Sequence, residues 1–363
     1  MTATATPVVA PTRTTTAGHL PKWAPWALLA ICLAISAVIF AFANSSGDPA
    51  DFNIVLTVVL GMIFYLVLIF VLSSVAESRR HATDRLMTAL VSSAFVVALL
   101  PLISLLYTVV VNGLTRFDAE FFSSSMRNIV GDGGGAVHAI WGTVLITLGA
   151  TVISVPIGLM TSIYLVEYGQ GKKLARGITF LVDVMTGIPS IVAGLFIYSV
   201  FALIVGPGTR MGIMGSLALS VLMIPVVVRG SEELLRIVPN ELREAAYALG
   251  VPKWLTILKV VLPTAIAGIT TSIMLAISRV IGETAPLLLT VGMVQGMNLN
   301  MFSGQMATLP VFSYMQAKYP GIPADAYLDR AWASALTLIL IVMVLNLVAR
   351  IIAKVFSPKT AGR

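Results

Sequence analysis

Residues 239–263 read PNELREAAYALGVPKWLTILKVVLP and join two long apolar runs of the chain. Asn240 suits the N-cap of a helix, Glu241 suits its first turn, and Gly250 suits the residue just after its end. A helix of about two turns between these points would carry a face of apolar and small side chains, namely Leu242, Ala245, Ala246 and Leu249. Such a face suits a helix that seats in a partner's groove, and it also suits an interfacial helix that lies on lipid.

The rest of the chain is too apolar for a water-soluble protein. Of its 363 residues, 58% are hydrophobic and 11% are charged, and the mean hydropathy is +0.96. A soluble domain is about half apolar and about a quarter charged. Backbone in lipid must satisfy its own hydrogen bonds, and long apolar runs do so as helices. We therefore predict an all-α integral membrane protein with eight spans, at about 26–43, 52–76, 87–111, 137–166, 178–205, 211–229, 263–294 and 333–355.

The net charge of +7 is explained by where the basic residues fall. Most of the 23 Lys and Arg residues lie in alternate segments that would share one side of the membrane. Cytoplasmic loops carry such an excess, so both termini are expected in the cytoplasm and a nucleic-acid partner is not needed to explain the charge. The few basic residues in segments predicted to be external are Arg116, Arg127, Arg210, Lys318 and Arg330.

The spans divide the chain into three parts. Residues 1–25, rich in Thr, Ala and Pro, are expected to form a flexible cytoplasmic tail. Residues 26–76 would form two N-terminal spans, and residues 77–363 a six-span domain with a cytoplasmic loop at 230–262. The first run ends in Ala41-Phe42-Ala43, which resembles a signal-peptide cleavage site. At about 17 residues it is longer than a signal core, so we expect a retained span.

The loop at 230–262 carries a recognisable motif that ends just beyond it. Its spacing resembles the EAA loop of the permease subunits of ABC importers, and the one departure is Val260, where that family usually has Ile. In the family this loop is the coupling helix that docks into a separate ATPase subunit. The resemblance implies that role here for Glu244, Ala245, Ala246, Gly250, Leu262 and Pro263.

Other stretches narrow the resemblance to the phosphate-permease branch of that family, of the PstA type. The resemblance covers about residues 87–357, and residues 1–76 lie outside it because the family core has six spans. The matching stretches are Gly133-Gly134-Gly135 with Gly142 to Thr147, Pro156-Ile157-Gly158 with Tyr164 to Tyr168, Gly187 to Val192, Arg279 to Pro286, and Thr308-Leu309-Pro310 before Ala331-Trp332-Ala333.

The resemblance implies a six-span ABC permease core plus two extra helices, in a bacterial plasma membrane. It implies a permease subunit of an ATP-driven phosphate importer that works by alternating access. The expected partners are a second related permease chain, two ATPase subunits on the cytoplasmic side, an external phosphate-binding protein, inorganic phosphate and membrane lipid. The residues alone leave open a permease for sulfate or molybdate, an ATPase-independent channel or secondary transporter, and a purely structural membrane subunit.

Two charged residues, Arg279 and Glu283, fall inside the predicted span 263–294. In a continuous helix they stand at i and i+4 on one face. A charge near the bilayer centre costs ~2.5–3.5 kcal/mol on insertion scales, so such residues usually face a bundle interior or a pathway. Pro286 removes the backbone hydrogen bond to the carbonyl of Gly282 and would weaken the helix there.

The chemistry of these two side chains suits phosphate. A guanidinium can donate two hydrogen bonds to phosphate oxygens. The carboxylate of Glu283 could accept a hydrogen bond from the P–OH group of phosphate, which sulfate lacks near neutral pH. We therefore expect Arg279 and Glu283 on the substrate path, with a self-neutralising structural ion pair as the alternative.

Several kinds of active site are not indicated. The one cysteine, Cys32, lies in an apolar run, and the three histidines, His19, His81 and His138, are scattered along the chain. The chain has no G-x-x-x-x-G-K-[ST] phosphate loop and no nucleophile–base constellation. We expect no catalysis by this chain itself, no metal site and no cofactor.

Overall fold

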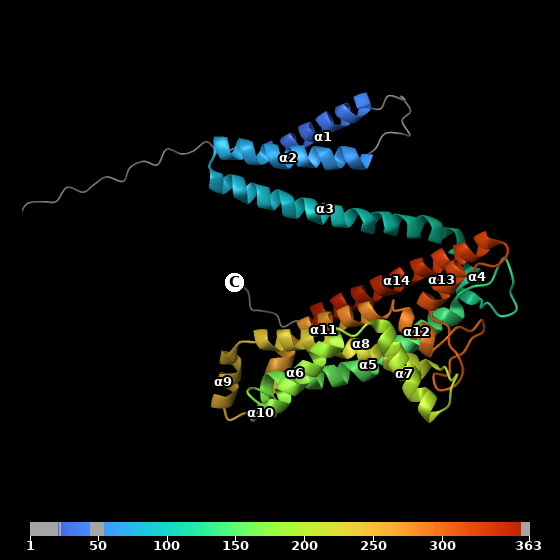
Figure 1. The fold of residues 1–363 in the computed structure, drawn as a ribbon. Coiled ribbons are helices and arrows are strands. Elements are labelled where there is room, and N and C mark those ends of the chain that lie inside the picture. The colour runs from blue at the N-terminus through green and yellow to red at the C-terminus, as the bar shows by residue number, and fades with distance from the viewer. Residues whose placement is uncertain (1–20, 22, 44–53, 357–363) are drawn as a thin grey trace, which may run out of the picture. The chain divides into compact units, whose positions relative to one another are not determined.

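The computed structural model describes residue 21 and residues 23–43 and 54–356, so most of the predicted tail lies outside the described residues. Every regular element in these ranges is a helix, as predicted (Figure 1). Seven helical stretches are long and apolar enough to cross a membrane. They are α1 (Ala24–Ala43), α2 (Ile54–Ala76), α3 (Arg79–Gly113), α5 (Val137–Ile163), α8 (Gly212–Ile237), α14 (Ala324–Phe356), and the continuous run of α10 (Lys253–Thr256), η4 (Ile257–Val261) and α11 (Leu262–Val280).

The predicted span at 178–205 is two helices rather than one. α6 (Lys173–Thr186) and α7 (Ser190–Ile204) meet at a bend of 107°. Pro189 precedes α7 with φ −59° and ψ 137°, an extended conformation. Because proline disfavours helical backbone in the residue before it, Ile188 and Pro189 together end one helix and start another.

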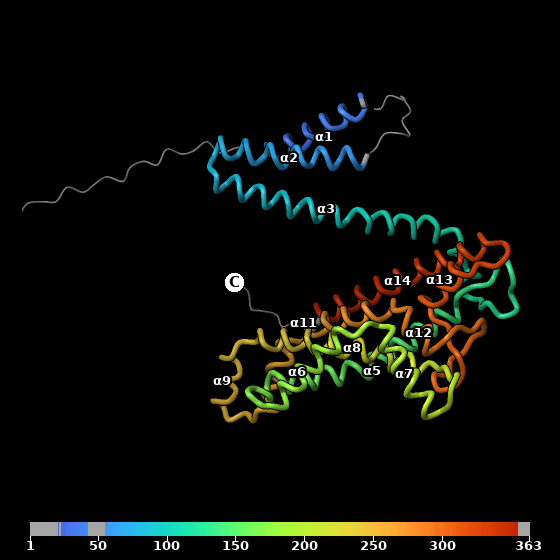
Figure 2. Tube along the Cα trace, viewed as in Figure 1, coloured from blue at the N-terminus to red at the C-terminus, as the bar shows by residue number. Residues whose placement is uncertain are grey.

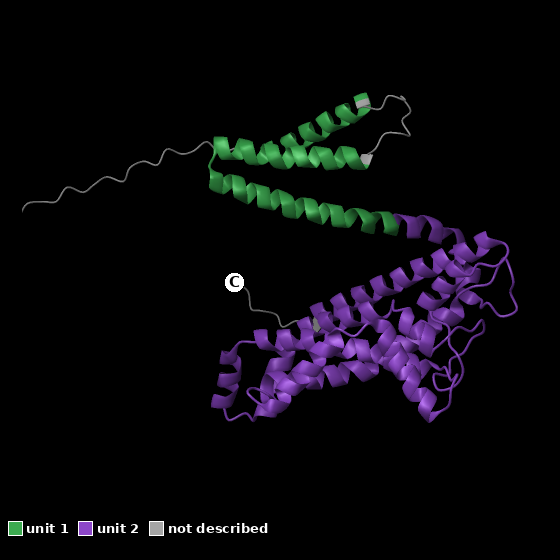
Figure 3. Cartoon of the chain, in the orientation of Figure 1, with its two compact units in different colours: residues 1–106 green, residues 107–363 purple. Residues whose placement is uncertain are grey.

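The chain forms two compact units, residues 1–106 and 107–363 (Figure 3). The boundary lies inside α3, whereas the sequence placed it at 76/77. Within the first unit, α1 and α2 approach closely at Gly61, where an added Cβ would lie 2.8 Å from the Leu33 side chain. At the turn between α2 and α3, the buried carboxylate of Glu77 accepts a hydrogen bond of 2.7 Å from Arg85.

The core of the second unit is the pair of α5 and α8, which run side by side with α11 (Figure 2). Small residues let α5 and α8 approach closely, as in many membrane helix pairs. An added Cβ at Gly158 would lie 2.7 Å from the Val227 side chain, and Ser216 Oγ donates to the carbonyl of Ile146 at 3.0 Å. α11 packs on both α8 and α14.

Residues 295–332 contain the helix α13 (Leu309–Lys318), which packs on α14 at the end of this unit far from α9 (Figure 1). Arg330 is fully buried there, and its Nη1 donates to the carbonyls of Gly131 and Gly133 at 2.7 and 2.9 Å. Arg330, which the sequence places in a segment predicted to be external, therefore holds the glycine-rich loop at residues 131–135 in place.

A second set of hydrogen bonds fixes the same glycine-rich loop from its other side. The N–H of Gly134 donates to Glu120 Oε1 at 2.8 Å, and Arg116 donates both to Glu120 Oε2 and to the Gly134 carbonyl at 2.9 Å. The hydrogen bond from Arg116, with that from Gly134, holds the pKa of Glu120 below its ordinary value.

Candidate functional site

The short helix predicted in the loop is α9 (Asn240–Ala248). Glu241 lies in its first turn, as predicted, where a carboxylate complements the helix dipole. Asn240 is not the N-cap, which corrects the prediction. Pro239 occupies that position with extended backbone (φ −58°, ψ 139°), and Asn240 is the first helical residue, whose Oδ1 accepts from Arg243 Nη1 at 3.2 Å.

The end of α9 is a Schellman motif built on Gly250. The N–H of Gly250 donates to the Tyr247 carbonyl at 2.9 Å, and the N–H of Val251 donates to the Ala246 carbonyl at 3.1 Å. Gly250 has φ +75°, the left-handed conformation that glycine adopts without strain. The chain therefore leaves α9 in a fixed direction toward α10.

The predicted docking face is only partly exposed. Leu242 and Leu249 are 41% and 83% exposed, and Ala245 is exposed beside Glu244. Ala246 is 8% exposed and packs inward, so it does not belong to the outer face. The motif ends with Leu262 and Pro263, the first two residues of α11, where the π-helical turn η4 leads directly into that helix.

Two residues that the sequence did not single out, Arg243 and Glu167, tie α9 to the rest of the unit. Nε and Nη2 of Arg243 donate to Glu167 Oε1 at 3.0 and 2.9 Å. Both side chains are largely buried, at 12% and 5% exposed. Glu167 belongs to the π-helical turn η3 (Tyr164–Tyr168) that follows α5. The sequence signal that could have found Glu167 is a single carboxylate at the end of an apolar run, because a buried carboxylate needs a partner.

Arg243 also satisfies the free carbonyls at the end of α8. Its Nη2 donates to the Leu235 carbonyl at 3.0 Å and its Nη1 to the Val238 carbonyl at 2.6 Å. The last carbonyls of a helix have no partners inside it, so an arginine there caps the helix. Lys253 of α10 adds a hydrogen bond to the Glu167 carbonyl, with its ammonium 5.0 Å from the Tyr168 ring centre.

Arg279 and Glu283 are arranged differently from the sequence prediction. α11 ends at Val280, and α12 (Ala285–Thr290) begins after a break. Arg279 is therefore in the last turn of α11 and Glu283 lies in the non-helical break, so they do not share a helix face. Neither side chain forms an ion pair or hydrogen bond with any residue that the structure describes. The alternative of a self-neutralising pair within this chain finds no support in this geometry.

The break at residues 281–284 is followed by α12, which packs on α7. Pro286 is the second residue of α12, where it starts a helix rather than weakening one. It packs closely on α7, because an added Cβ at Gly194 would lie 2.7 Å from Pro286 Cα. Gly282 faces open space, with Arg279 exposed and Glu283 half-buried. The helix that follows the charged residues in the chain, α12, therefore packs on the helix that follows the α6–α7 bend.

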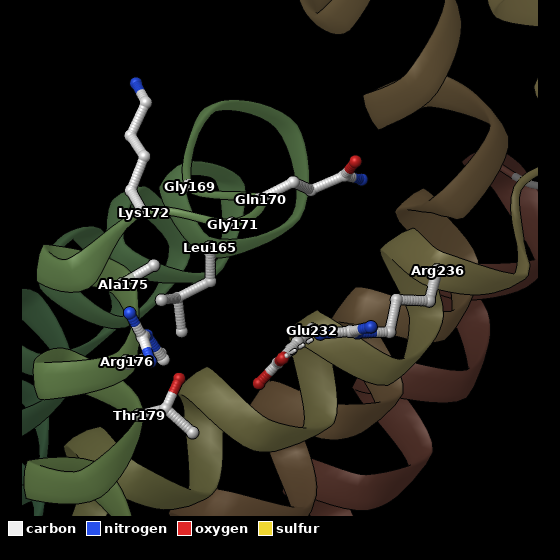
Figure 4. Close-up of a pocket in the computed structure, with 10 residues that line it drawn as sticks. All are labelled: Leu165, Gly169, Gln170, Gly171, Lys172, Ala175, Arg176, Thr179, Glu232 and Arg236. Carbon is white, nitrogen blue, oxygen red and sulfur yellow. Dashed lines mark hydrogen bonds and ion pairs between the residues drawn. The ribbon is translucent and has the colours of Figure 1, made fainter.

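A pocket of about 390 Å³ lies near the α9 end of the unit, between the turn before α6 and the end of α8 (Figure 4). Its charged lining residues are Lys172, Arg176, Arg236 and Glu232. Glu232 already accepts hydrogen bonds from Arg236 at 2.7 Å and from Arg229 at 2.9 Å. The pocket thus has a net positive lining beside an acid that is already paired.

Known proteins resemble this chain over most of its length. A sequence model of the family described as "Binding-protein-dependent transport system inner membrane component" matches residues 154–362. The "Phosphate transport system permease protein PstA 1" of Mycobacterium tuberculosis (strain CDC 1551 / Oshkosh) is 46% identical over 279 residues, which are 76% of this chain and 90% of that protein. The "Phosphate transport system permease protein PstA" of Yersinia pestis is 38% identical over 276 residues, which are 76% of this chain and 92% of that protein.

A solved structure has a similar fold. The inward-facing MetNI methionine ABC transporter matches with a TM-score of 0.51 at 21% identity, over 61% of this chain and 95% of that chain. At this identity the likeness concerns the arrangement of the helices.

Proposed function

Because the chain belongs to the family of binding-protein-dependent transport system inner membrane components, we propose that it is the permease subunit of an ATP-driven phosphate importer. The observation that carries the proposal is the 46% identity to a phosphate transport system permease over 90% of that relative's length. The exposed α9 and the charged break between α11 and α12 support the proposal, because they are candidates for the coupling site and the substrate path of such a subunit.

The proposed partners follow from these surfaces. An ATPase subunit would seat on the face of α9 formed by Leu242, Ala245 and Leu249, with Gly250 setting the exit of the chain. A second, related permease chain would complete the pore, and an external phosphate-binding protein would deliver the anion to the opposite side. ATP binding would draw the coupling helices together and turn the pore outward, and hydrolysis would return it inward.

The proposed substrate path includes Arg279 and Glu283. An unpaired guanidinium at the end of a membrane helix and a carboxylate in a non-helical break are costly in lipid unless they line a pathway. Discontinuous helices place backbone and charged groups at substrate sites in other transporters. Arg279 would bind phosphate oxygens and Glu283 would accept the hydrogen of a P–OH group.

The whole proposal is tested by uptake of labelled phosphate in a strain that lacks this chain. Restored expression is expected to restore uptake, with excess sulfate and molybdate having little effect. Restored sulfate or molybdate uptake without phosphate uptake would identify a permease for another oxyanion. Uptake that persists without the ATPase subunit would identify a channel or secondary transporter.

The substrate path is tested by Arg279→Lys and Glu283→Gln, each normalised to the amount of assembled complex. Lysine keeps the charge but cannot form the planar two-hydrogen-bond contact, so we expect phosphate uptake to fall about tenfold or more. Because the two side chains are not paired, the double variant Arg279→Met with Glu283→Gln should not recover uptake. Recovery to near-normal uptake would show that the pair is structural and would exclude direct binding.

A further inference from the structure

The connections of α9 to the membrane helices depend on a small number of contacts. Its close helix packing is against α10 and η4, which follow it in the chain. Its link to the end of α5 is the ion pair of Arg243 with Glu167. The ion pair therefore joins α9 directly to η3, which follows α5, whereas the packing of α9 on η4 reaches α5 only through the buried layer beneath.

The geometry of the contact is that of a rigid joint. Arg243 uses all three of its nitrogens, and its acceptors outside α9 and the residue before it are Glu167, after α5, and the carbonyls of Leu235 and Val238 at the end of α8. The guanidinium is planar and always charged, so the directions of its hydrogen bonds are fixed. Glu167 is held in turn by the hydrogen bond from Lys253 to its carbonyl.

Beneath the Arg243–Glu167 contact lies a layer of buried apolar side chains from the membrane helices. The buried apolar side chains of this layer come from α5, η3, α8, η4 and α11, and they pack as one cluster. Its members are Ile163, Val166, Leu235, Val238, Ile257, Val261, Ala265 and Ile269. Packed cores change between discrete arrangements rather than deforming continuously, so a displacement entering at Arg243 is passed on as a shift of helices.

Two π-helical turns contribute side chains to the same buried layer. η3 contains Glu167, and η4 joins α10 to α11. π-helical turns are rare and occur frequently at functional sites, because each adds a residue that re-aims the side chains after it. Here η3 orients the carboxylate toward Arg243, and η4 packs against α9.

We propose that Arg243 and Glu167 are positioning residues that transmit the displacement of α9 to α5 and α8, so that the ATPase cycle is coupled to pore movement. The inference rests on the proposed function, because it assigns a role within the transport cycle. Without the Arg243–Glu167 contact, the ATPase should still hydrolyse ATP, but the membrane helices should follow the movement of α9 less closely.

The experiment uses the complete transporter, with its ATPase and external binding protein, reconstituted in liposomes. Phosphate uptake and ATP hydrolysis are measured in the same preparation for wild type, Arg243→Lys and Glu167→Gln. Both variants keep some hydrogen bonding and are expected to assemble. Phosphate transported per ATP hydrolysed should fall about tenfold, within the range of typical coupling between sites.

Arg236→Lys is the matched control. Arg236 forms an ion pair with Glu232 near the same end of α8, but its side chain is 64% exposed and the pair stays within one helix. Its transport per ATP should remain within about twofold of wild type, since exposed pairs contribute little. An Arg236→Lys loss as large as that of Arg243→Lys would overturn the proposal, because the loss would then not be specific to the contact of Arg243 with Glu167.

A second readout separates transmission from stability. Spin labels on Ala248→Cys in α9 and Gln170→Cys after η3, with Cys32 replaced by Ser, report the distance between these elements. The distance distribution should be narrow in wild type and broader in Arg243→Lys. An unchanged distribution, or a loss confined to the amount of assembled complex, would overturn the proposal. Absence of ATP-dependent uptake in wild type would refute the permease function instead.

Discussion

Gly250 and Gly142 are both required as glycines, for different steric reasons. Gly250 has φ +75°, and an added Cβ would meet nothing within 4 Å, so its requirement is one of backbone conformation. Gly142 lies in α5, where an added Cβ would be 1.9 Å from the carbonyl oxygen of Ala307, so its requirement is space. The two residues therefore respond to different substitutions.

Replacing Gly250 tests the conformational requirement. Gly250→Val should abolish uptake, because a β-branched residue resists the left-handed conformation and would unwind the end of α9. Gly250→Asn should keep a substantial part of the uptake, since asparagine tolerates that conformation. Uptake and copurification of the ATPase are measured for both. Equal loss in the two variants would point to a clash with the partner rather than to backbone strain.

Replacing Gly142 tests the requirement for space. Gly142→Ala should lower the free energy of unfolding by about 3 kcal/mol, the upper end of the range for overpacking, because backbone must move. Gly177→Ala, in α6 where an added Cβ meets nothing within 4 Å, is the control and should not destabilise, because alanine is favoured over glycine inside a helix by about 1 kcal/mol. Thermal unfolding of the detergent-purified protein measures both. A Gly142→Ala protein as stable as wild type would contradict the packing of α5 on the Ala307 segment.

At the scale of elements, apolar length identified the helices but not their interruptions. The runs at 178–205 and 263–294 are continuous in hydropathy, yet each is broken, at 187–189 and at 281–284. Proline did not reveal the breaks, because Pro101, Pro156 and Pro225 all lie inside continuous helices. Pro189 and Pro286 do adjoin the breaks, so proline alone does not tell a break from a continuous helix, and the packing of Gly194 on Pro286 is a tertiary contact that no local pattern contains.

Local sequence patterns also missed the parts of the candidate sites that depend on contacts between distant residues. The motif around Glu244 was found because its spacing is local in the sequence. Arg243 and Glu167 were missed because their contact joins residues far apart in the chain. The assignment of Arg279 and Glu283 to one helix face was wrong because a helical period was assumed across the break. Ala246 faces inward for a tertiary reason as well, since α10 and η4 pack on α9.

The non-helical state of residues 281–284 is tested by Gly282→Ala. An added Cβ there meets nothing within 4 Å, so the substitution acts mainly through helix propensity, which favours alanine by about 1 kcal/mol. Extension of α11 should reduce uptake several-fold with assembly unchanged. Phosphate uptake normalised to assembled complex is the measurement, with Gly177→Ala as the control inside an existing helix. Unchanged uptake would mean that the break is not needed for transport.

At the scale of the whole molecule, the charge pattern and the fold agree on two distinct ends of the second unit. The end near α9 gathers Arg236, Arg243 and Lys253 around the paired acids Glu167 and Glu232. At the opposite end Arg330 is buried as a structural residue, which leaves fewer exposed cations there than the sequence suggests.

The orientation itself is tested by cysteine labelling in a protein with Cys32 replaced by Ser. Val130→Cys, at a residue 88% exposed, should react with a membrane-impermeant maleimide in intact cells. Gln170→Cys, exposed at the α9 end, should react only after the cells are opened. The positive-inside rule gives this expectation. The reverse pattern would place α9 outside the cell and remove it from any cytoplasmic ATPase.

The bend between α6 and α7 has a consequence for how the protein is made. With 15 residues, α7 is about 22 Å long, shorter than the ~30 Å hydrocarbon layer, so it cannot settle across the bilayer as it leaves the ribosome. Its packing partner, Pro286 of α12, is synthesised much later, after α8 and α11. We therefore expect the α6–α7 region to reach its final position only after α12 has been synthesised.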